Sequence, residues 1–270
     1  LMLWGRYASQ ASEARYPQLW QGRVYAACPS VQGPAGLNLY DLSGRGIRGT
    51  LTNMDVATDW VRSPGSYALD FDGTNDHIPL GTISRLNASE YSAAVWIKAA
   101  ATTAGQKSIL AQIDVTGNSG RAIRRNANQI EYTVANGGSF AQYKSGSTIT
   151  TDWTHIALTV SGVSAPRIWI NGVESTVSLT ASSGTVTLPA AQPCMIGIDG
   201  QFGTTTTLYN FAGLIDDVAV YDRRITGGEA RLLSRRRGIT YEARRDIVSG
   251  SSGFSAYWAR RNSQIIGGGV

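Results

Sequence analysis

The stretch ALDFDGTNDHIPL, residues 68–80, places three carboxylates along what reads as a strand followed by a turn. Asp70, Asp72 and Asp76 offer oxygens to a metal ion, and Gly73 permits a tight turn between the last two. Asp and Asn side chains also accept hydrogen bonds from nearby backbone N–H groups and thereby shape turns. The stretch alone leaves two interpretations open: a metal site or a corner between strands.

Catalysis would need a different arrangement of acidic residues. Cleavage of a glycosidic bond uses two carboxylates, about 5–5.5 Å apart in retaining enzymes, and a strand presents such a pair at positions i and i+2 or i+4. The six glutamates are isolated in the sequence, and the same-face pair Asp70 and Asp72 belongs to the turn motif. Neither His77 nor His155 lies near a nucleophile motif such as GxSxG. The sequence therefore predicts a protein that is not an enzyme.

Length and composition limit the remaining classes. The 270 residues suffice for one large β domain with a sizeable core. The 31 glycines and the short runs of Thr, Ser, Val and Ile favour sheets and turns over helices. No run approaches the roughly 18 apolar residues of a membrane span. Cys28 and Cys194 match no metal-binding motif and form either one disulfide or two buried free thiols.

Short alternating segments follow one another between residues 67 and 222, and this regular spacing predicts an antiparallel sandwich or jelly roll. The Asn171-Gly172 pair is a strong hairpin signal. Helical character is confined to ITGGEARLLSRR, where Thr226 can cap the helix and Glu229 occupies its third position. The expected strands include YALDFDG, HIPL, YSAAVWIKA, KSILAQID, AIRR, QIEYTVAN, SFAQYKS, WTHIALTVS, CMIGIDG and FAGLIDDVAVYDR.

Five motifs, in their order and spacing, resemble the laminin-G-like and concanavalin A-like jelly-roll family: ALDFDGTNDHIPL, YSAAVWIKA, WTHIALTVSG, IWINGVE and FAGLIDDVAVYDRRITGGEARLL. The resemblance implies an all-β, two-sheet antiparallel sandwich over residues 37–236. An N-terminal lead-in over residues 1–36 and a basic C-terminal arm over residues 237–270 would flank it. The lead-in LWQGRVYAACPSVQGPAGLNLYDLSGRGIRGTLTNMD also resembles a subgroup found in phage-type and environmental bacterial genes.

Many members of this family hold a calcium ion near the rim of the sandwich. The resemblance therefore implies a structural calcium site, with oxygens from Asp72, Asn75 and Asp76 in the turn and from Asp216 and Asp217 in LIDDVAV. Because Asp216 and Asp217 are neighbours on a strand, they point to opposite faces, and at most one reaches such a site. Shaping of the turn remains the alternative role for these side chains.

The family includes lectins, adhesion modules, glycan hydrolases and structural domains, so the resemblance does not fix the function. Sugar binding would call for aromatic side chains on loops, accompanied by Asn, Asp or Gln. Tyr143, Phe202, Tyr209 and Asn210 lie on or beside expected loops and are the candidate ligand-binding residues. Core packing is the alternative for each aromatic residue.

Basic charge is concentrated in the last part of the chain. Residues 223–270 carry ten arginines against three acidic residues, a net charge of +7, whereas the rest of the chain carries −2. Arginine is favoured at protein–protein contacts, so we expect the termini to dock on neighbouring subunits; a solvated tail and an anionic partner remain alternatives. The candidate assembly residues are Arg235, Arg236, Arg237, Arg244, Arg245, Tyr257, Trp258, Arg260 and Arg261.

These observations together predict a non-enzymatic jelly-roll module of a virion surface or another extracellular assembly, of the capsid-decorating or fibre-like kind. Its expected partners are other protein subunits and surface glycans, and nucleic acid is not expected. A secreted or cell-surface lectin-like domain that binds carbohydrate is the alternative.

Overall fold

The computed structural model describes residues 14–63, 66–83, 85, 89–114, 118–199 and 209–243. These residues form mainly β-strands, as the alternating segments predict. In chain order the elements are η1 (Pro17–Trp20), β1 (Arg23–Ala27), α2 (Pro29–Gln32), β2 (Asn38–Tyr40), β3 (Arg48–Thr50), β4 (Trp60–Ser63), β5 (Ser66–Asp72), β6 (Ile78–Thr82), β7 (Glu90–Ala99), β8 (Gln106–Ile113), β9 (Gly120–Asn126), β10 (Gln129–Asn136), β11 (Ser139–Thr148), β12 (Thr154–Ser161), β13 (Arg167–Ile170), β14 (Val173–Ser175), β15 (Val177–Ser183), β16 (Pro193–Ile196), β17 (Ala212–Tyr221), α3 (Gly227–Leu233) and η3 (Ile239–Tyr241).

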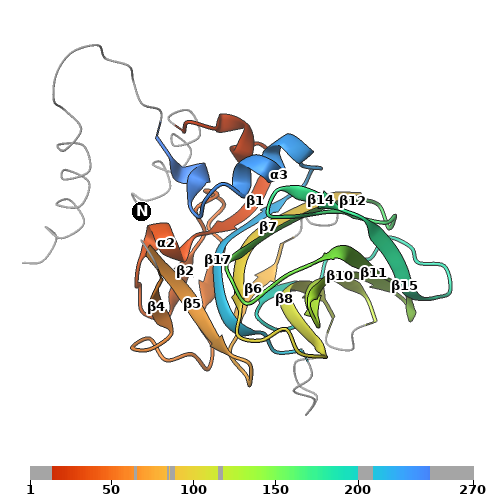
Figure 1. The fold of residues 1–270 in the computed structure, drawn as a ribbon, viewed down its shortest axis with the longest axis horizontal. Coiled ribbons are helices and arrows are strands. Elements are labelled where there is room, and N and C mark those ends of the chain that lie inside the picture. Colours follow the sequence, from red (N-terminus) through yellow and green to blue (C-terminus); the bar gives the residue numbers. More distant parts are fainter. Residues whose placement is uncertain are drawn as a thin grey trace, which may run out of the picture.

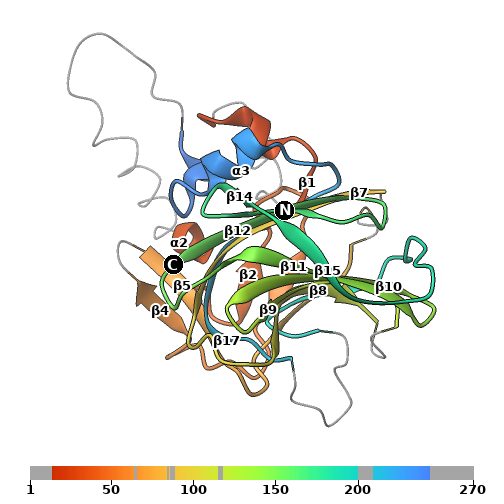
Figure 2. The ribbon, with the colours of Figure 1, turned by 45° about the vertical axis from the view of Figure 1, so that its right-hand side comes forward.

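Two antiparallel sheets lie face to face (Figures 1 and 2). The back sheet has the strand order β14-β13-β12-β7-β17-β5-β4, and β1 pairs with β17 beside this path. The front sheet has the order β15-β11-β10-β9-β8-β16-β6. A separate pair is formed by β2 and β3. This topology confirms the predicted two-sheet antiparallel sandwich.

Apolar side chains on the inner faces of the two sheets form the main core. Val95 and Ile97 of β7 in the back sheet belong to the same buried cluster as Tyr132 and Val134 of β10 in the front sheet. Removal of apolar surface from water contributes roughly 25 cal/mol per Å². Alternate residues of each strand point inward, and the apolar surface that they bury holds the two sheets together.

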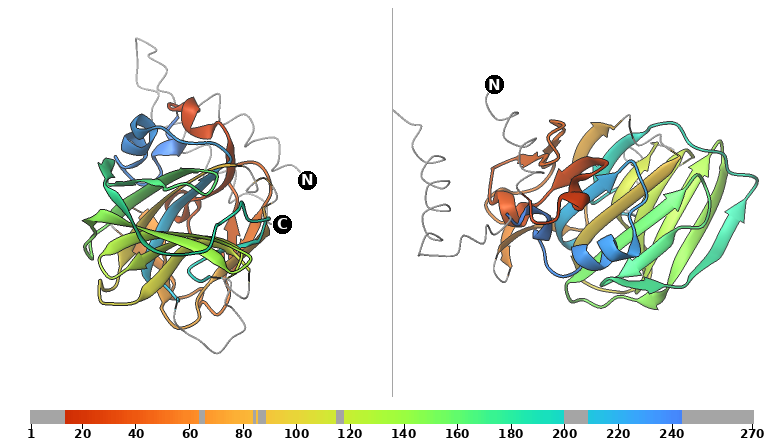
Figure 3. Two further views of the ribbon diagram at one scale, coloured as in Figure 1. Left: turned by 90° about the vertical axis from the view of Figure 1, so that its right-hand side faces the viewer. Right: turned by 90° about the horizontal axis from the view of Figure 1, so that it is seen from above.

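The outer face of the back sheet is covered by a second layer. Leu19 of η1 and Leu233 of α3 pack with Trp169 of β13 and Tyr221 of β17 in a second buried cluster. Figure 3 shows η1 and α3 together on this side of the sandwich. Segments from both parts of the chain that flank the sandwich thus cover the back sheet around Trp169 and Tyr221.

The described parts of the expected flanking arms belong to the folded body. All five residues of β1 are buried, and β1 extends the back sheet by pairing with β17. The backbone N–H of Arg15 donates to the carbonyl of Glu242 across 2.7 Å. The expected boundaries at residues 36/37 and 236/237 therefore do not separate arms from the body at these points, because these segments pack against the sheet.

Three local predictions can be compared directly with the structure. Thr226 Oγ1 accepts a hydrogen bond from the Glu229 N–H at 3.2 Å, and Glu229 Oε2 accepts one from the Thr226 N–H at 2.8 Å, so the predicted helix cap is confirmed in α3. Asn171 joins β13 to β14 with a φ of 51°, the left-handed conformation that this hairpin requires. Cys28 and Cys194 are buried free thiols rather than a disulfide. Within the described residues, no helix is long and apolar enough to cross a membrane.

Candidate functional site

The outer face of the front sheet carries polar and charged side chains. Along β10, Tyr132 points into the core, so its neighbours Glu131 and Thr133 point outward. The strand register places Arg124 of β9 opposite Glu131, and Gln142 of β11 opposite Thr133. The sheet therefore gathers a set of polar groups on the face opposite to the covered back sheet.

Arg124 is the centre of this set. Its Nε and Nη2 donate to Asp199 Oδ2 at 3.2 and 2.9 Å, and its Nη1 donates to Thr133 Oγ1 at 3.0 Å. Nη1 also lies 3.6 Å from Glu131 Oε1. The Arg124 side chain is 7% exposed, and the two carboxylates are 1% exposed. One buried guanidinium thus holds two buried carboxylates from different parts of the chain.

Glu131 accepts further hydrogen bonds that complete its pairing. Gln106 Nε2 donates to Oε1 at 2.6 Å, and Asn126 Nδ2 donates to Oε2 at 2.9 Å. Lys144 Nζ lies 4.0 Å from Oε2 and is 25% exposed. A buried charge is tolerated when it is paired and hydrogen-bonded, and Glu131 meets both conditions.

Tyr209 contacts this network through both its backbone and its ring. Its carbonyl accepts a hydrogen bond from the Ser108 N–H of β8 at 2.7 Å, and the guanidinium of Arg124 lies 4.9 Å from the centre of its ring. A cation at this distance from an aromatic face is attracted to it, by about 0.5–2 kcal/mol depending on exposure. Arg124 therefore links Tyr209 to the sheet.

A pocket of about 140 Å³ opens on this face of the sheet. Its wall combines neutral amides and hydroxyls, two aromatic rings and the edge of Arg124. The lining residues are Asn118, Arg124, Thr133, Ala135, Gly138, Ser139, Phe140, Gln142 and Tyr209. Polar side chains thus predominate in this lining, and the rings of Phe140 and Tyr209 stand among them.

The four predicted ligand-binding residues do not share this pocket. Tyr209 lines it. Tyr143 packs against the main core, because it stands opposite the inward-facing Tyr132. Asn210 is buried and its amide donates to the carbonyl of Thr74, so it supports the β5–β6 corner. Phe202 lies outside the described residues.

The acidic corner after β5 makes the contacts of a shaped turn. Asp72 Oδ1 accepts hydrogen bonds from the N–H groups of Thr74 and Asn75 at 2.7 and 3.3 Å. Asp76 Oδ2 accepts one from the N–H of Asp72 at 2.9 Å. Burial, together with neighbouring carboxylates that include Asp72, raises the pKa of Asp76 to about 6. These contacts match the turn-shaping interpretation of the stretch.

Asp216 and Asp217 lie elsewhere and bind other parts of the chain. Asp216 Oδ1 accepts from the Ser30 N–H of α2 at 3.1 Å, and its Oδ2 lies 3.3 Å from Arg237 Nη1. Asp217 Oδ2 accepts from the Gly238 N–H at 2.9 Å. The expected sharing of one site with the acidic corner is therefore wrong, because these carboxylates hold α2 and the segment after α3.

The remaining candidate groups are the possible metal ligands and the two histidines. Among the described residues, no three His, Cys, Asp or Glu side chains form a group that could hold a metal ion. The calcium site stays a prediction. His155 is buried in β12, its ring centre is 5.3 Å from that of Trp96, and burial lowers its pKa to about 3. His77 Nδ1 lies 2.8 Å from the carbonyl oxygen of Asn75 at the acidic corner.

Three of the predicted assembly residues are described. Arg236 forms an ion pair with Glu242, and Arg237 stacks over the ring of Trp153 at 4.2 Å. The backbone N–H of Arg235 donates to the Leu232 carbonyl at the end of α3. Docking through the termini stays a prediction. The remaining candidates lie outside the described residues: Arg244, Arg245, Tyr257, Trp258, Arg260 and Arg261.

Comparison with protein families identifies the chain. Residues 72–231 match the model of the concanavalin A-like lectin/glucanases superfamily. This match covers more than half of the 270 residues, and the chain belongs to this family. No curated protein matches the chain. The finer resemblance to phage-type genes stays a prediction.

Solved structures with a similar fold include toxin domains and an enzyme. The receptor binding domain of botulinum neurotoxin mosaic serotype C/D has a TM-score of 0.60 and 15% identity over 80% of this chain and 51% of that one. A structure on cell entry of botulinum neurotoxin type C through two ganglioside molecules has a TM-score of 0.57 and 14% identity over 81% and 52%. The sialidase of Trypanosoma rangeli, in complex with 2,3-difluorosialic acid, has a TM-score of 0.58 and 14% identity over 86% and 37%. The chain thus spans about half of the toxin chains and about a third of the sialidase chain, and these similarities show a shared fold.

Proposed function

We propose that this domain binds carbohydrate through the pocket on the front sheet and does not cleave it. The observation that carries the proposal is the pocket itself, where Tyr209 and Phe140 stand beside the amide of Gln142 and the hydroxyl of Ser139. Aromatic faces pack against the C–H surface of a sugar ring, and amides and hydroxyls exchange hydrogen bonds with its hydroxyl groups. On the opposite side of the sandwich, η1 and α3 pack over the back sheet around Trp169 and Tyr221.

The proposal includes the absence of catalysis. It is supported by the lack of carboxylates that a ligand in the pocket could reach among the described lining residues. The described residues that line the pocket include no carboxylate. Glu131 and Asp199 are the nearest acidic groups of the network, but both are 1% exposed and both are held by Arg124. Most glycoside hydrolases use two carboxylates that flank the substrate, whereas sialidases use a tyrosine as the nucleophile. A buried pair behind the pocket wall cannot supply those two carboxylates.

The similar structures agree with this proposal. One of them is a receptor binding domain, and another is described through its interaction with ganglioside molecules. The sialidase shares the fold as well, so direct measurement must separate binding from turnover. A secreted or surface-exposed location follows from the proposed ligand and forms part of the same proposal.

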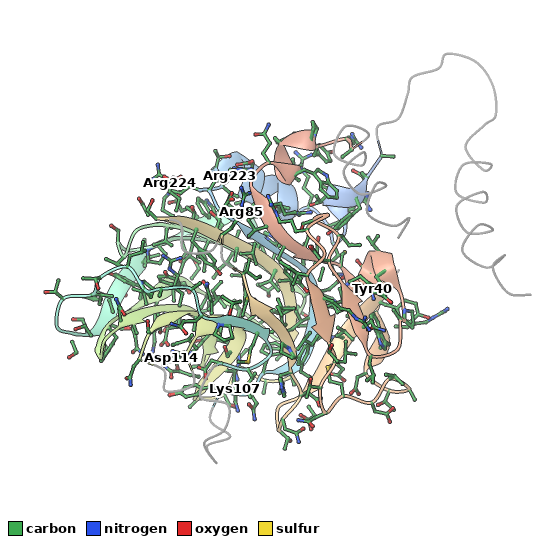
Figure 4. The ribbon with its side chains drawn as sticks, turned by 180° about the vertical axis from the view of Figure 1, so that it is seen from behind. Tyr40, Arg85, Lys107, Asp114, Arg223 and Arg224 are labelled. Carbon is green, nitrogen blue, oxygen red and sulfur yellow. The ribbon has the colours of Figure 1, made fainter. Side chains whose placement is uncertain are left out.

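The test is a glycan array screened with the full chain, followed by calorimetric titration of the best ligand. Tyr209→Ala is expected to weaken binding by roughly threefold to tenfold, the value of one aromatic contact. Tyr40→Ala is the matched control, because Tyr40 is 45% exposed and belongs to β2. Figure 4 shows Tyr40 on a different part of the molecule from Lys107 of β8 and Asp114, which directly follows β8 in the front sheet.

Three outcomes decide the proposal. Equal loss of affinity in both tyrosine variants would place the ligand outside the pocket, and absence of binding to any glycan would remove the function. Release of reducing ends from a bound polysaccharide would show that the domain is an enzyme after all.

A further inference from the structure

The charge balance of the pocket says which sugars it can hold, provided that the proposed carbohydrate binding is correct. Among the described lining residues, Arg124 is the charged one. Its guanidinium faces two carboxylates, those of Asp199 at 2.9 Å and Glu131 at 3.6 Å. The positive charge at the back of the pocket is therefore compensated inside the protein.

Arg124 is also geometrically engaged. Nε and Nη2 both donate to Asp199, Nη1 donates to Thr133, and Tyr209 lies over the guanidinium. Arginine grips a ligand carboxylate with two parallel N–H groups. To offer such a fork to a ligand, Arg124 would have to leave Asp199, and two buried carboxylates would then lack their shared cation. An acidic sugar therefore gains no free partner here.

The other described lining residues are neutral and suit an uncharged sugar. Asn118 and Gln142 supply amides, Ser139 supplies a hydroxyl, and Phe140 supplies an aromatic ring. Lys144, the second cation beside Glu131, is not part of the described lining. The pocket volume of about 140 Å³ is below the roughly 300–1,000 Å³ of sites for drug-sized ligands. This small volume favours a single sugar ring over an oligosaccharide.

We infer that the pocket binds a single uncharged sugar at the end of a glycan and discriminates against sialic acid and uronic acids. This specificity differs from what the sialic acid analogue in the sialidase structure and the gangliosides of the toxin would suggest. It follows from the pairing of Arg124 with Asp199 and Glu131, which is a property of these side chains and not of the fold.

The experiment uses pairs of glycans that share one core and differ by a terminal sialic acid. The full chain is titrated with both members of each pair. We expect the uncharged member to bind at least about tenfold more tightly, since a carboxylate that loses hydration without gaining a partner readily costs that factor. Binding of the uncharged member should also change little between low and high salt, because no ion pair is formed with the ligand.

A variant that gains affinity provides a test that a general loss of binding or folding cannot imitate. Gln142→Arg places an uncompensated cation in the pocket wall, at a half-buried position on the outer face of β11. This variant is expected to gain affinity for the sialylated member, whereas Gln142→Leu, the matched uncharged control, gains none. Thermal unfolding of both variants checks that the fold is retained.

The outcomes distinguish the preference for uncharged sugars from carbohydrate binding itself. Tighter binding of the sialylated glycans by the unmodified chain overturns the inference and leaves carbohydrate binding intact. Equal affinity for both members, or failure of Gln142→Arg to gain affinity while it remains folded, also overturns the inference. Absence of binding to every glycan overturns the proposed function together with it.

Discussion

Replacement of Asp216 by asparagine is expected to change how the stability of the fold depends on pH. The Asp216 carboxyl is fully buried, and burial, followed by the neighbouring Asp217 carboxylate, raises its pKa to about 7. The charged and titratable groups around it are Asp217 on β17, the Cys28 thiol before α2 and the Arg237 guanidinium after α3. The Arg237 contact favours the ionised form, but the loss of hydration outweighs it.

The sign and size of the effect follow from the raised pKa. Between its ordinary pKa of 3.8 and about 7, the native Asp216 keeps its proton and the unfolded one loses it. The free energy of unfolding therefore falls as the pH rises through this range. At about 1.4 kcal/mol per pH unit, the full difference amounts to about 4 kcal/mol, an upper value because Asp216 is coupled to Asp217.

The assay is urea denaturation of the full chain and of Asp216→Asn, followed by tryptophan fluorescence at intervals from about pH 4 to about pH 8. The stability of the unmodified chain relative to the variant should decline across this range, by several kcal/mol. A constant difference between the two proteins would refute the reasoning. A relative gain in stability with rising pH would show that the Arg237 ion pair outweighs desolvation.

Further predictions concern the pocket network, the helix cap and the thiols. Arg124→Met should lower the free energy of unfolding by about 3–5 kcal/mol, because it leaves two buried carboxylates without their shared cation; a loss under about 1 kcal/mol in urea denaturation would contradict this. Thr226→Ala should cost about 1 kcal/mol, because the capping hydrogen bonds with Glu229 are lost, and an unchanged urea midpoint would argue against the cap. Cys28 and Cys194 are buried, and burial raises both thiol pKa values, so both should resist alkylation in the native protein and react in urea. Rapid labelling of the native chain would be inconsistent with the structure.

Features that depend on local chemistry could be predicted from the sequence. Alternation within YSAAVWIKA and QIEYTVAN predicts strands that the structure contains as β7 and β10. The cap at Thr226 and the hairpin at Asn171 also depend on residues close in sequence. In each case the physical cause lies within a few residues, so a single segment is sufficient to infer it.

Features that depend on long-range contacts could not be predicted in this way. The strand β15 has the sequence VSLTASS, and most of its residues are exposed, so no apolar alternation marks it. The packing of β1 depends on Arg23, which donates to Thr240, 217 residues away in the chain. A single sequence gives no sign of such pairs.

The pocket network shows the same limit. Glu131 is isolated in the sequence, yet the register of β9 and β10 places it opposite Arg124. Asp199 meets Arg124 from 75 residues further along the chain. The available signal was a charged residue at an outward position in each of two adjacent strands, AIRR and QIEYTVAN. This signal identifies a polar face of the sheet, but it does not identify Asp199 as the third residue of the network.

The two ends of the described body meet at one place. Ala14 and Ala243 form an antiparallel bridge, on the side of the sandwich that carries η1 and η3. A polypeptide that contains this body therefore enters and leaves it at a single attachment point, turned away from the pocket. Such a body can be inserted into a surface loop of another protein, or recircularised and opened elsewhere, with little disturbance of the sandwich. In either setting the pocket would face outward from the attachment.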